Sequence, residues 1–286
     1  MEALTPAVLR LQIPFCARDC AFCQKPRLPG WDSQRLHSYV QALLGELRAN
    51  ADSFSDREVC AIRVGGGNAT ALEGEDLWDL YRCIRDCFPL APDAPVTILA
   101  SPFQISGGRL AFYNRLPVAR YDYELFSLSA GDDGWLGFPD PTEKLRWAAN
   151  MTHAQAGSMG GVLLLGHPAQ SPGDFRKSLV AFTRLPACHL TLLPHPDSPA
   201  ASLDPAELAL LEQAGYVNYA PGRFARPGHE DRYTQLKRAG ADELAFGLGA
   251  RTRFAGAVSE NTLDLDTYLA HSDDFLAITA RAYPAN

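Results

Sequence analysis

The stretch IPFCARDCAFC, residues 13–23, places three cysteines at the end of the first apolar segment of the chain. Cys16, Cys20 and Cys23 have the spacing C-x3-C-x2-C, and Phe22 stands directly before the third cysteine. Residues 8–13 have the composition of a buried strand, so the three thiols follow a strand end. In a reducing compartment, cysteines clustered in this way indicate metal or redox chemistry more than disulfides.

The length, composition and charge of the chain limit the classes to which the protein can belong. The chain has 286 residues, 47% of them hydrophobic, and a net charge of -7, which is enough for one large domain or two small ones. An acidic balance without a long basic run argues against non-specific nucleic-acid binding. No apolar stretch approaches the roughly 20 residues that a membrane-spanning helix needs, and the first residues lack a signal-peptide pattern. We therefore expect a cytoplasmic protein with no nucleic-acid partner and no membrane span.

Strand-like and helix-like segments alternate through the first two thirds of the chain. The segments that we expect to be strands are apolar on both faces, as a parallel sheet buried on both sides requires. They cover residues 8–13, 59–64, 95–100, 121–128, 161–165 and 188–193, and the expected helices cover residues 33–51, 73–88, 141–156, 174–184 and 205–215. This alternation predicts an α/β fold, a partial (β/α)6 barrel that resembles a TIM barrel, with its site at the carboxyl ends of the strands.

The composition changes after residue 195. Pro, Gly, Ser, Asp and Arg become frequent, and aromatic residues are scattered among them. Such a composition predicts loops. We expect a core domain over residues 1–195 and a short, irregular C-terminal extension over residues 196–286, which packs on the core and is not an independent domain.

Three thiolates suit one kind of metal centre better than another. In a [4Fe–4S] cluster each iron needs one ligand besides its sulfides, so three cysteines leave one iron open. A structural zinc ion is normally closed by a fourth protein ligand, and no Cys or His follows Cys23 within ten residues. A zinc-stabilised structural protein stays an alternative, with a distant fourth ligand among His153, His167, His189, His195 and His229.

Two other features are weaker signals. Gly65, Gly66 and Gly67 follow an expected strand, where glycines permit a tight turn or a close approach to a ligand. Cys83 and Cys87 are four residues apart in an expected helix. They form either a second metal or redox pair or, as we favour, two small apolar residues on one helix face.

Taken together, the motifs resemble the radical S-adenosylmethionine (SAM) superfamily. More narrowly, the chain is similar to the oxygen-independent coproporphyrinogen III oxidase family, which includes a haem-chaperone-like branch. The similarity spans residues 8–270 and is carried by IPFC (13–16), GGGNA (65–69), LLGHPAQS (164–171), HLTLLP (189–194), GYVNYAPGRFARPGHEDR (215–232) and FGLGARTRF (246–254). The resemblance implies the partial barrel of the radical SAM type.

The resemblance also implies roles for individual residues. Cys16, Cys20 and Cys23 would hold a [4Fe–4S] cluster, and the amino and carboxylate groups of SAM would bind the open iron. The other implied SAM contacts are Phe22 near the adenine, Gly65, Gly66, Gly67 and Asn68 at the methionine end, and Gln170 at the ribose. A donor such as flavodoxin or ferredoxin would reduce the cluster, which would cleave SAM to methionine and a 5′-deoxyadenosyl radical. The implied substrate is a tetrapyrrole, such as haem, or another carboxylated small molecule.

Several positions depart from the family pattern. Arg10 and Gln12 stand where the family has Tyr and His, and Leu99, Gly131 and Val162 stand where polar residues commonly contact SAM. Two hypotheses follow: a divergent radical SAM enzyme, or a catalytically impaired cluster-bearing protein that binds haem. The residues that would then face a ligand include His167, His195, His229, Arg223, Arg226 and Arg232, since arginine suits bidentate binding of carboxylates.

Overall fold

The computed structural model describes residues 3–16, 20, 22–23, 26–102, 107–136, 158–198 and 201–285. These residues form one 12-stranded sheet with the order β12-β11-β10-β9-β1-β2-β3-β4-β5-β6-β8-β7. The first six strands are β1 (Thr5–Ile13), β2 (Arg57–Gly66), β3 (Val96–Ala100), β4 (Val118–Phe126), β5 (Ser158–Leu165) and β6 (Ala187–Pro194). The later strands are β7 (Val217–Ala220), β8 (Arg223–Ala225), β9 (Asp242–Phe246), β10 (Arg251–Phe254), β11 (Ala257–Asn261) and β12 (Thr279–Pro284).

The helices lie between the strands in chain order. The longer ones are α1 (Ser33–Ala49), α2 (Gly74–Cys87), α6 (Pro172–Thr183) and α7 (Pro205–Gln213). The shorter ones are α3 (Gly107–Tyr113), α4 (Asp133–Leu136), α8 (Arg232–Arg238), α9 (Leu265–His271) and α10 (Phe275–Ile278), with 3-10 turns at Asp52–Phe54 (η1), Ala69–Ala71 (η2) and Ala130–Asp132 (η3). No helix within the described part of the chain is long and apolar enough to cross a bilayer.

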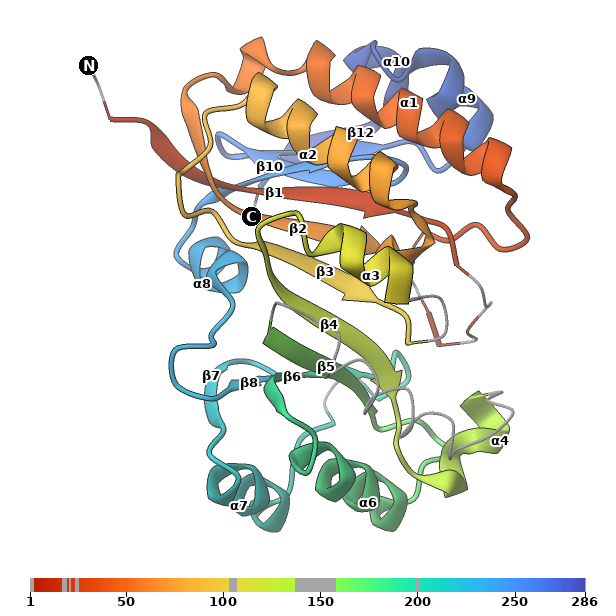
Figure 1. Cartoon of the computed structure of the whole chain (residues 1–286), viewed down its shortest axis with the longest axis vertical. Coiled ribbons are helices and arrows are strands. Elements are labelled where there is room, and N and C mark those ends of the chain that lie inside the picture. The colour runs from red at the N-terminus through yellow and green to blue at the C-terminus, as the bar shows by residue number, and fades with distance from the viewer. Residues whose placement is uncertain are drawn as a thin grey trace.

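The central strands run parallel from β9 through β1 to β6. The sheet curves but does not close, because β12 and β7 are its two edge strands (Figure 1). The carboxyl ends of β1 to β6 therefore meet along one edge of a curved sheet. This arrangement confirms the predicted α/β partial barrel.

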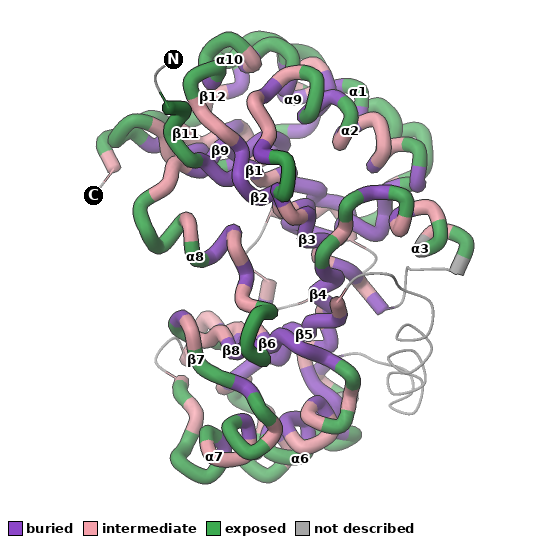
Figure 2. The backbone as a smooth tube through the Cα atoms, turned by 60° about the vertical axis from the view of Figure 1, so that its left-hand side comes forward, coloured by how far each residue is buried: buried purple, intermediate pink, exposed green. Residues whose placement is uncertain are grey.

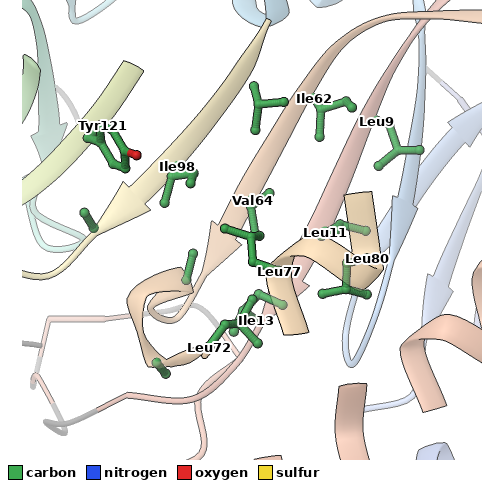
Figure 3. Close-up of a cluster of buried hydrophobic side chains, with 14 of the residues drawn as sticks. Leu9, Leu11, Ile13, Ile62, Val64, Leu72, Leu77, Leu80, Ile98 and Tyr121 are labelled. Carbon is green, nitrogen blue, oxygen red and sulfur yellow. The ribbon is translucent and has the colours of Figure 1, made fainter. Parts of the chain in front are cut away.

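Alternation along β1 divides its side chains between the two faces of the sheet. Leu9, Leu11 and Ile13 are buried on the outer face, against Leu77 and Leu80 of α2 (Figure 3). The helix α1 begins after Asp32, whose carboxylate caps the helix by accepting a hydrogen bond of 2.7 Å from the backbone of Arg35. The outer face thus carries the main hydrophobic core. The residues of β1 between these positions have their side chains on the opposite, concave face.

The C-terminal extension reaches the concave face. Tyr233 of α8 packs there against Val8 of β1 and Ala61 of β2, and α8 lies on the side of the sheet away from α1 and α2 (Figure 1). Figure 2 shows that the chain segments around α8 contain both buried and exposed residues. Further along, β9 pairs with β1 in parallel, from Ala7↔Asp242 to Leu11↔Phe246.

The expected elements agree with the structure in kind and differ at their ends. All six expected strands are present, and β4 begins three residues earlier than expected, at Val118. The helix α3 between β3 and β4 was not expected, and the helix expected over residues 141–156 lies outside the described residues. The extension is also more regular than its composition suggested, because it contains the strands β7 to β12. Its division from the core at residue 195 stays a prediction.

Candidate functional site

The cysteine motif and the glycine run are joined by backbone hydrogen bonds. The strands β1 and β2 are parallel neighbours, so their carboxyl ends lie together. The N–H of Gly67 donates to the carbonyl of Ile13 over 2.7 Å, and the N–H of Asn68 donates to that of Phe15 over 3.0 Å. The N–H of Leu28 donates to the carbonyl of Pro14 over 2.7 Å, which closes the base of the cysteine loop. The two motifs therefore form one structural unit.

The thiol of Cys16 faces the backbone of Gly67. A Cβ placed on Gly67 would lie 2.8 Å from Cys16 Sγ and equally close to the carbonyl oxygen of Ile13. Real Cβ atoms do not approach so closely, so only glycine fits beside the first thiol. The glycine predicted to lie near the cofactor is thus required by a cysteine of the motif.

The other two cysteines lie on a tight turn. The N–H of Cys23 donates to the carbonyl of Cys20 over 3.0 Å, and a guanidinium nitrogen of Arg27 donates to the carbonyl of Cys23 over 2.5 Å. All three thiols of the motif are free of disulfides and partly buried. Within the described ranges, no three His, Cys, Asp or Glu side chains converge on a position for a single metal ion. The structure thus places the first thiol of the cysteine motif beside the glycine turn.

Phe22 connects the cysteine loop to the far strands of the sheet. Its ring meets that of Phe126 edge-on, with centroids 4.9 Å apart, and packs with Leu136 and Leu164. Phe126, at the end of β4, has φ of 56°, a left-handed conformation that is costly for an aromatic residue. The loop therefore extends from β1 to the ends of β4 and β5, and its proposed contact with adenine stays a prediction.

Neighbouring side chains explain why glycine is required at two of the three positions. Gly66 has φ of +122°, and a Cβ there would collide with the amide group of Gln12. A Cβ on Gly65 would lie 2.8 Å from Cδ1 of Leu99. The side-chain oxygen of Asn68 accepts a hydrogen bond of 2.9 Å from the N–H of Thr70, which caps η2. Whether these residues also contact SAM stays a prediction.

Gln170 lies at the ends of the strands, where the sequence placed it. Its side-chain oxygen accepts from the N–H of Gly166 over 3.1 Å, and its amide nitrogen donates to Asp132 over 3.3 Å. Asp132 is fully buried and also accepts from Ser127 over 2.6 Å and from the indole N–H of Trp135 over 3.1 Å. Asp132 is not predictable as a site residue, because nothing in its local sequence distinguishes it from a solvated loop residue.

Two of the three candidate histidines meet near this end of the sheet. The rings of His167 and Trp135 stack with centroids 3.8 Å apart and planes 5° apart, and His195 meets His167 edge-on at 4.8 Å. Burial and the charge of His195 lower the pKa of His167. His229 instead approaches Ser158 at the amino end of β5, so it lies at the opposite edge from the cysteine motif.

The three candidate arginines also lie in different parts of the structure. Arg223 lies on β8 and donates to the hydroxyl of Thr191 over 3.0 Å on the concave face. The guanidinium of Arg226 lies over the ring of Tyr216, and Arg232 pairs with Asp93 at the surface over 2.7 Å. Only Arg223 is thus directed at the concave face by the contacts that the structure shows.

A buried ionic network that local sequence does not predict occupies the concave face of the sheet. Arg120 of β4 binds Asp122 and Asp231, in each case over 2.8 Å, and Arg63 of β2 also binds Asp231. Nε2 of His189 lies 2.7 Å from the hydroxyl of Tyr219. Burial favours the neutral acid at Asp122 and Asp231, but the neighbouring cations hold the pKa of both carboxyls below its ordinary value.

The positions that depart from the family pattern are ordinary parts of the sheet or its loops. Leu99 packs against Gly65, and Val162 is buried between Glu124 and Thr191 in the register of β4, β5 and β6. A Cβ on Gly131 would lie 2.6 Å from the carboxylate of Asp174. The polar groups expected at these three positions are therefore replaced by packing contacts.

The pair Cys83 and Cys87 lies on the outer helix α2. The two Sγ atoms are 3.8 Å apart, and burial together with Cys87 raises the pKa of Cys83 to about 12. A thiol with so high a pKa is protonated at neutral pH and unreactive. This supports the apolar interpretation of the pair.

Comparison with known proteins agrees with this arrangement. The heme chaperone HemW of Escherichia coli is 29% identical over 273 residues, which cover 87% of this chain and 71% of HemW. The oxygen-independent coproporphyrinogen III oxidase of Salmonella typhimurium is 25% identical, over 94% of this chain and 66% of the oxidase. The relatives of this chain are radical SAM proteins of the HemN and HemW type.

The solved structures support the same fold. The structure titled coproporphyrinogen III oxidase (HemN) from Escherichia coli, a radical SAM enzyme, superimposes with a TM-score of 0.81 and 21% identity, over 100% of this chain and 73% of that one. No family model matches the chain. The chain spans about two thirds of the length of the curated oxidases that it matches. The radical SAM resemblance inferred from the sequence is confirmed at the level of homologues and fold.

Proposed function

We propose that this chain binds a [4Fe–4S] cluster through Cys16, Cys20 and Cys23 and reductively cleaves SAM. The observation that carries the proposal is the contact between Cys16 Sγ and the Gly67 backbone, which joins the thiol loop to the glycine turn. Three partly buried thiols without a fourth cysteine in the loop suit a cluster with one open iron. When bound and reduced, such a cluster supplies the electron that breaks a carbon–sulfur bond of SAM.

The residues of the chain would bind and orient the cofactors. The Gly65–Gly67 turn and Asn68 would offer backbone groups to the methionine end of SAM, and Phe22, Leu136 and Leu164 would exclude water from the loop. Gln170 would contribute its amide at the ends of the strands. A donor such as flavodoxin or ferredoxin would reduce the cluster, and the substrate would be a tetrapyrrole or another carboxylated small molecule.

A second candidate function is haem binding without SAM turnover. Leu99 and Val162 favour it, because they put apolar packing where polar contacts to SAM are expected. The similarity to HemW, named as a heme chaperone, supports it as well. The two functions differ in whether SAM is consumed.

Anaerobic reconstitution with iron and sulfide separates these functions. We expect a visible absorption band of an iron–sulfur cluster in the wild-type protein and its loss in C16A, C20A and C23A. The matched control is C87A, since Cys87 is also a partly buried free cysteine but lies on α2. Release of 5′-deoxyadenosine after reduction with SAM supports the enzyme. A cluster band without that product, together with stoichiometric haem binding, supports the second function, and bound zinc without a cluster contradicts both.

A further inference from the structure

Tyr39 of α1 supports the segment that leads from β1 into the cysteine loop. Its hydroxyl donates a hydrogen bond of 2.6 Å to the carbonyl of Gln12, and its ring meets that of Phe15 edge-on, with centroids 5.2 Å apart. Phe15 directly precedes Cys16 and is itself fully buried. Burial raises the pKa of Tyr39, so the hydroxyl keeps its proton and remains a donor to Gln12. The backbone before the first thiol is therefore held from the side of α1.

A turn of the C-terminal extension, residues 247–250, reaches the same hydroxyl. Since β9 pairs with β1 in parallel, the turn that follows β9 lies beside the end of β1. The N–H of Leu248 donates to the hydroxyl oxygen of Tyr39 over 3.0 Å. A Cβ on Gly247 would lie 2.5 Å from that oxygen and 2.7 Å from the carbonyl oxygen of Gln12, so only glycine permits this approach. The hydroxyl of Tyr39 thus links α1, β1 and the extension.

The 247–250 turn also contacts the segment that leaves the cysteine loop. A Cβ on Gly249 would lie 2.6 Å from Cγ of Pro26, three residues after Cys23. The turn is itself anchored, because the N–H of Gly249 donates to the carbonyl of Thr262, directly after β11, over 2.8 Å. One turn of the extension is therefore in contact with the chain on both sides of the three cysteines.

We propose that Tyr39 and the 247–250 turn position the cysteine loop for its iron–sulfur cluster, so that retention of the cluster depends on the C-terminal extension. The inference deepens the proposed function and rests on it for the cluster. Tyr39 and the turn act through Gln12, Phe15 and Pro26, so they are positioning residues and not ligands. A loop whose two ends are fixed loses less conformational entropy when three thiolates close on one cluster. Weakening either contact would therefore make the cluster easier to lose while the sheet stays folded.

Y39F tests the support from α1, with Y216F as its matched control. Both replacements remove the hydroxyl of a fully buried tyrosine that donates to a backbone carbonyl over 2.6 Å, but the acceptor for Tyr216 is Ala187, at the amino end of β6. Each protein is loaded anaerobically with iron and sulfide, and the release of iron to a chelator is followed by the fading of the visible band. We expect release to be about fivefold to tenfold faster in Y39F than in the wild type and unchanged in Y216F, because a buried hydrogen bond next to the loop is lost.

G249A tests the support from the extension, with G256A as its matched control. Gly249 and Gly256 have φ of +63° and +78°, so alanine strains the backbone at both positions. A Cβ on Gly256 would meet nothing within 4 Å, whereas one on Gly249 would press on Pro26. It would also lie 2.6 Å from the side chain of Leu263, which is exposed and can turn away. We expect iron release to be faster in G249A than in G256A.

Hydrogen exchange in the apoprotein separates positioning from general stability. The N–H of Cys16 donates to the carbonyl of Leu28, and the N–H of Leu28 donates to that of Pro14, so both groups report on the base of the cysteine loop. We expect both to exchange faster in Y39F and G249A than in the two control variants. Equal iron release and equal exchange in Y39F and Y216F would show that Tyr39 only stabilises the fold, and would overturn the inference. Iron release that follows the unfolding temperature across all four variants would overturn it as well.

Failure of this inference can be told apart from failure of the proposed function. A wild-type protein that forms no cluster contradicts the proposed function, and exchange in the apoprotein then decides the positioning of the loop alone. Faster exchange at Leu28 in Y39F than in Y216F supports that positioning, and equal exchange overturns it. A stable cluster in the wild type and in all four variants keeps the proposed function and overturns the positioning.

Discussion

The hydroxyl of Tyr268 in α9 donates a hydrogen bond of 2.6 Å to the carboxylate of Glu46 in α1. The same carboxylate accepts from the side chain of Asn261 and from the N–H of Gly247, each over 2.7 Å. Glu46 is thus a buried acid on the first helix whose partners all belong to the C-terminal extension. It ties the extension to α1 of the core, and the ring of Tyr268 also lies 5.3 Å from that of Tyr39.

Glu46 should make stability fall as pH rises. Burial raises its pKa from 4.5 to about 7 in the folded protein, so the folded state holds a proton that the unfolded state releases. The contribution is fully present below pH 4.5, is lost between pH 4.5 and 7, and is on the order of 3 kcal/mol. Urea unfolding at several pH values should show this decline in the wild type and in the exposed control E212Q, and a flatter profile in E46Q. Parallel profiles for all three proteins would contradict the assignment.

A methyl group on Gly67 should disrupt the cysteine loop. The added Cβ would lie 2.8 Å from Cys16 Sγ and 2.7 Å from the carbonyl carbon of Pro14, and the backbone atoms cannot move away cheaply. We expect G67A to lose about 1–3 kcal/mol of stability and most of the reconstituted iron–sulfur band. The control is G108A, since a Cβ on Gly108 would meet nothing within 4 Å. Normal cluster loading in G67A would refute the close packing at the first thiol.

The charge of Asp231 should contribute more to the stability of the folded protein than its role as the N-cap of α8 does. Asparagine caps helices as well as aspartate does, but D231N would leave Arg63 and Arg120 without their shared partner. We expect a loss of about 3–5 kcal/mol. D264N is the control, because Asp264 caps α9 through the same bond to a threonine N–H at an exposed position. Equal unfolding midpoints for the two variants would show that the ionic network adds no stability.

The stack of Trp135 on His167 should be visible in tryptophan fluorescence. An imidazolium quenches an indole in contact more strongly than a neutral imidazole does, and the pKa of His167 is lowered from 6.5. We expect emission to fall as pH decreases, with a midpoint below 6.5. H167Q and W135F should both remove the transition. A transition that persists in W135F belongs to another tryptophan.

Some of the fold was predictable because it depends on local patterns. The apolar segments that became β1, β2, β3 and β6 are short and end at glycine or proline clusters, which mark strand ends regardless of tertiary context. The strands of the extension were missed because β7, β8 and β10 are only three or four residues long. Their hydrogen bonds to distant strands, not their composition, make them regular.

The candidate site likewise contains some features that local sequence predicts and others that it does not. The C-x3-C-x2-C motif is contiguous, and its relation to the glycine run follows from two parallel strands that are neighbours in the sequence. The ionic network is different, because Arg63 and Asp231 are 168 residues apart, and each alone looks like a solvated charge.

The pairing of β1 with β9 has a consequence for the order of events during synthesis. The strand that leads into the cysteine motif lies inside the sheet, but one of its edges stays unpaired until Phe246 has left the ribosome. At usual translation rates this delay is roughly 10 to 50 s. During that time the thiols of a nascent chain adjoin an open strand edge, which is a template for wrong pairing. The strand that precedes the cysteine motif therefore acquires its second neighbour only after β9 has been made.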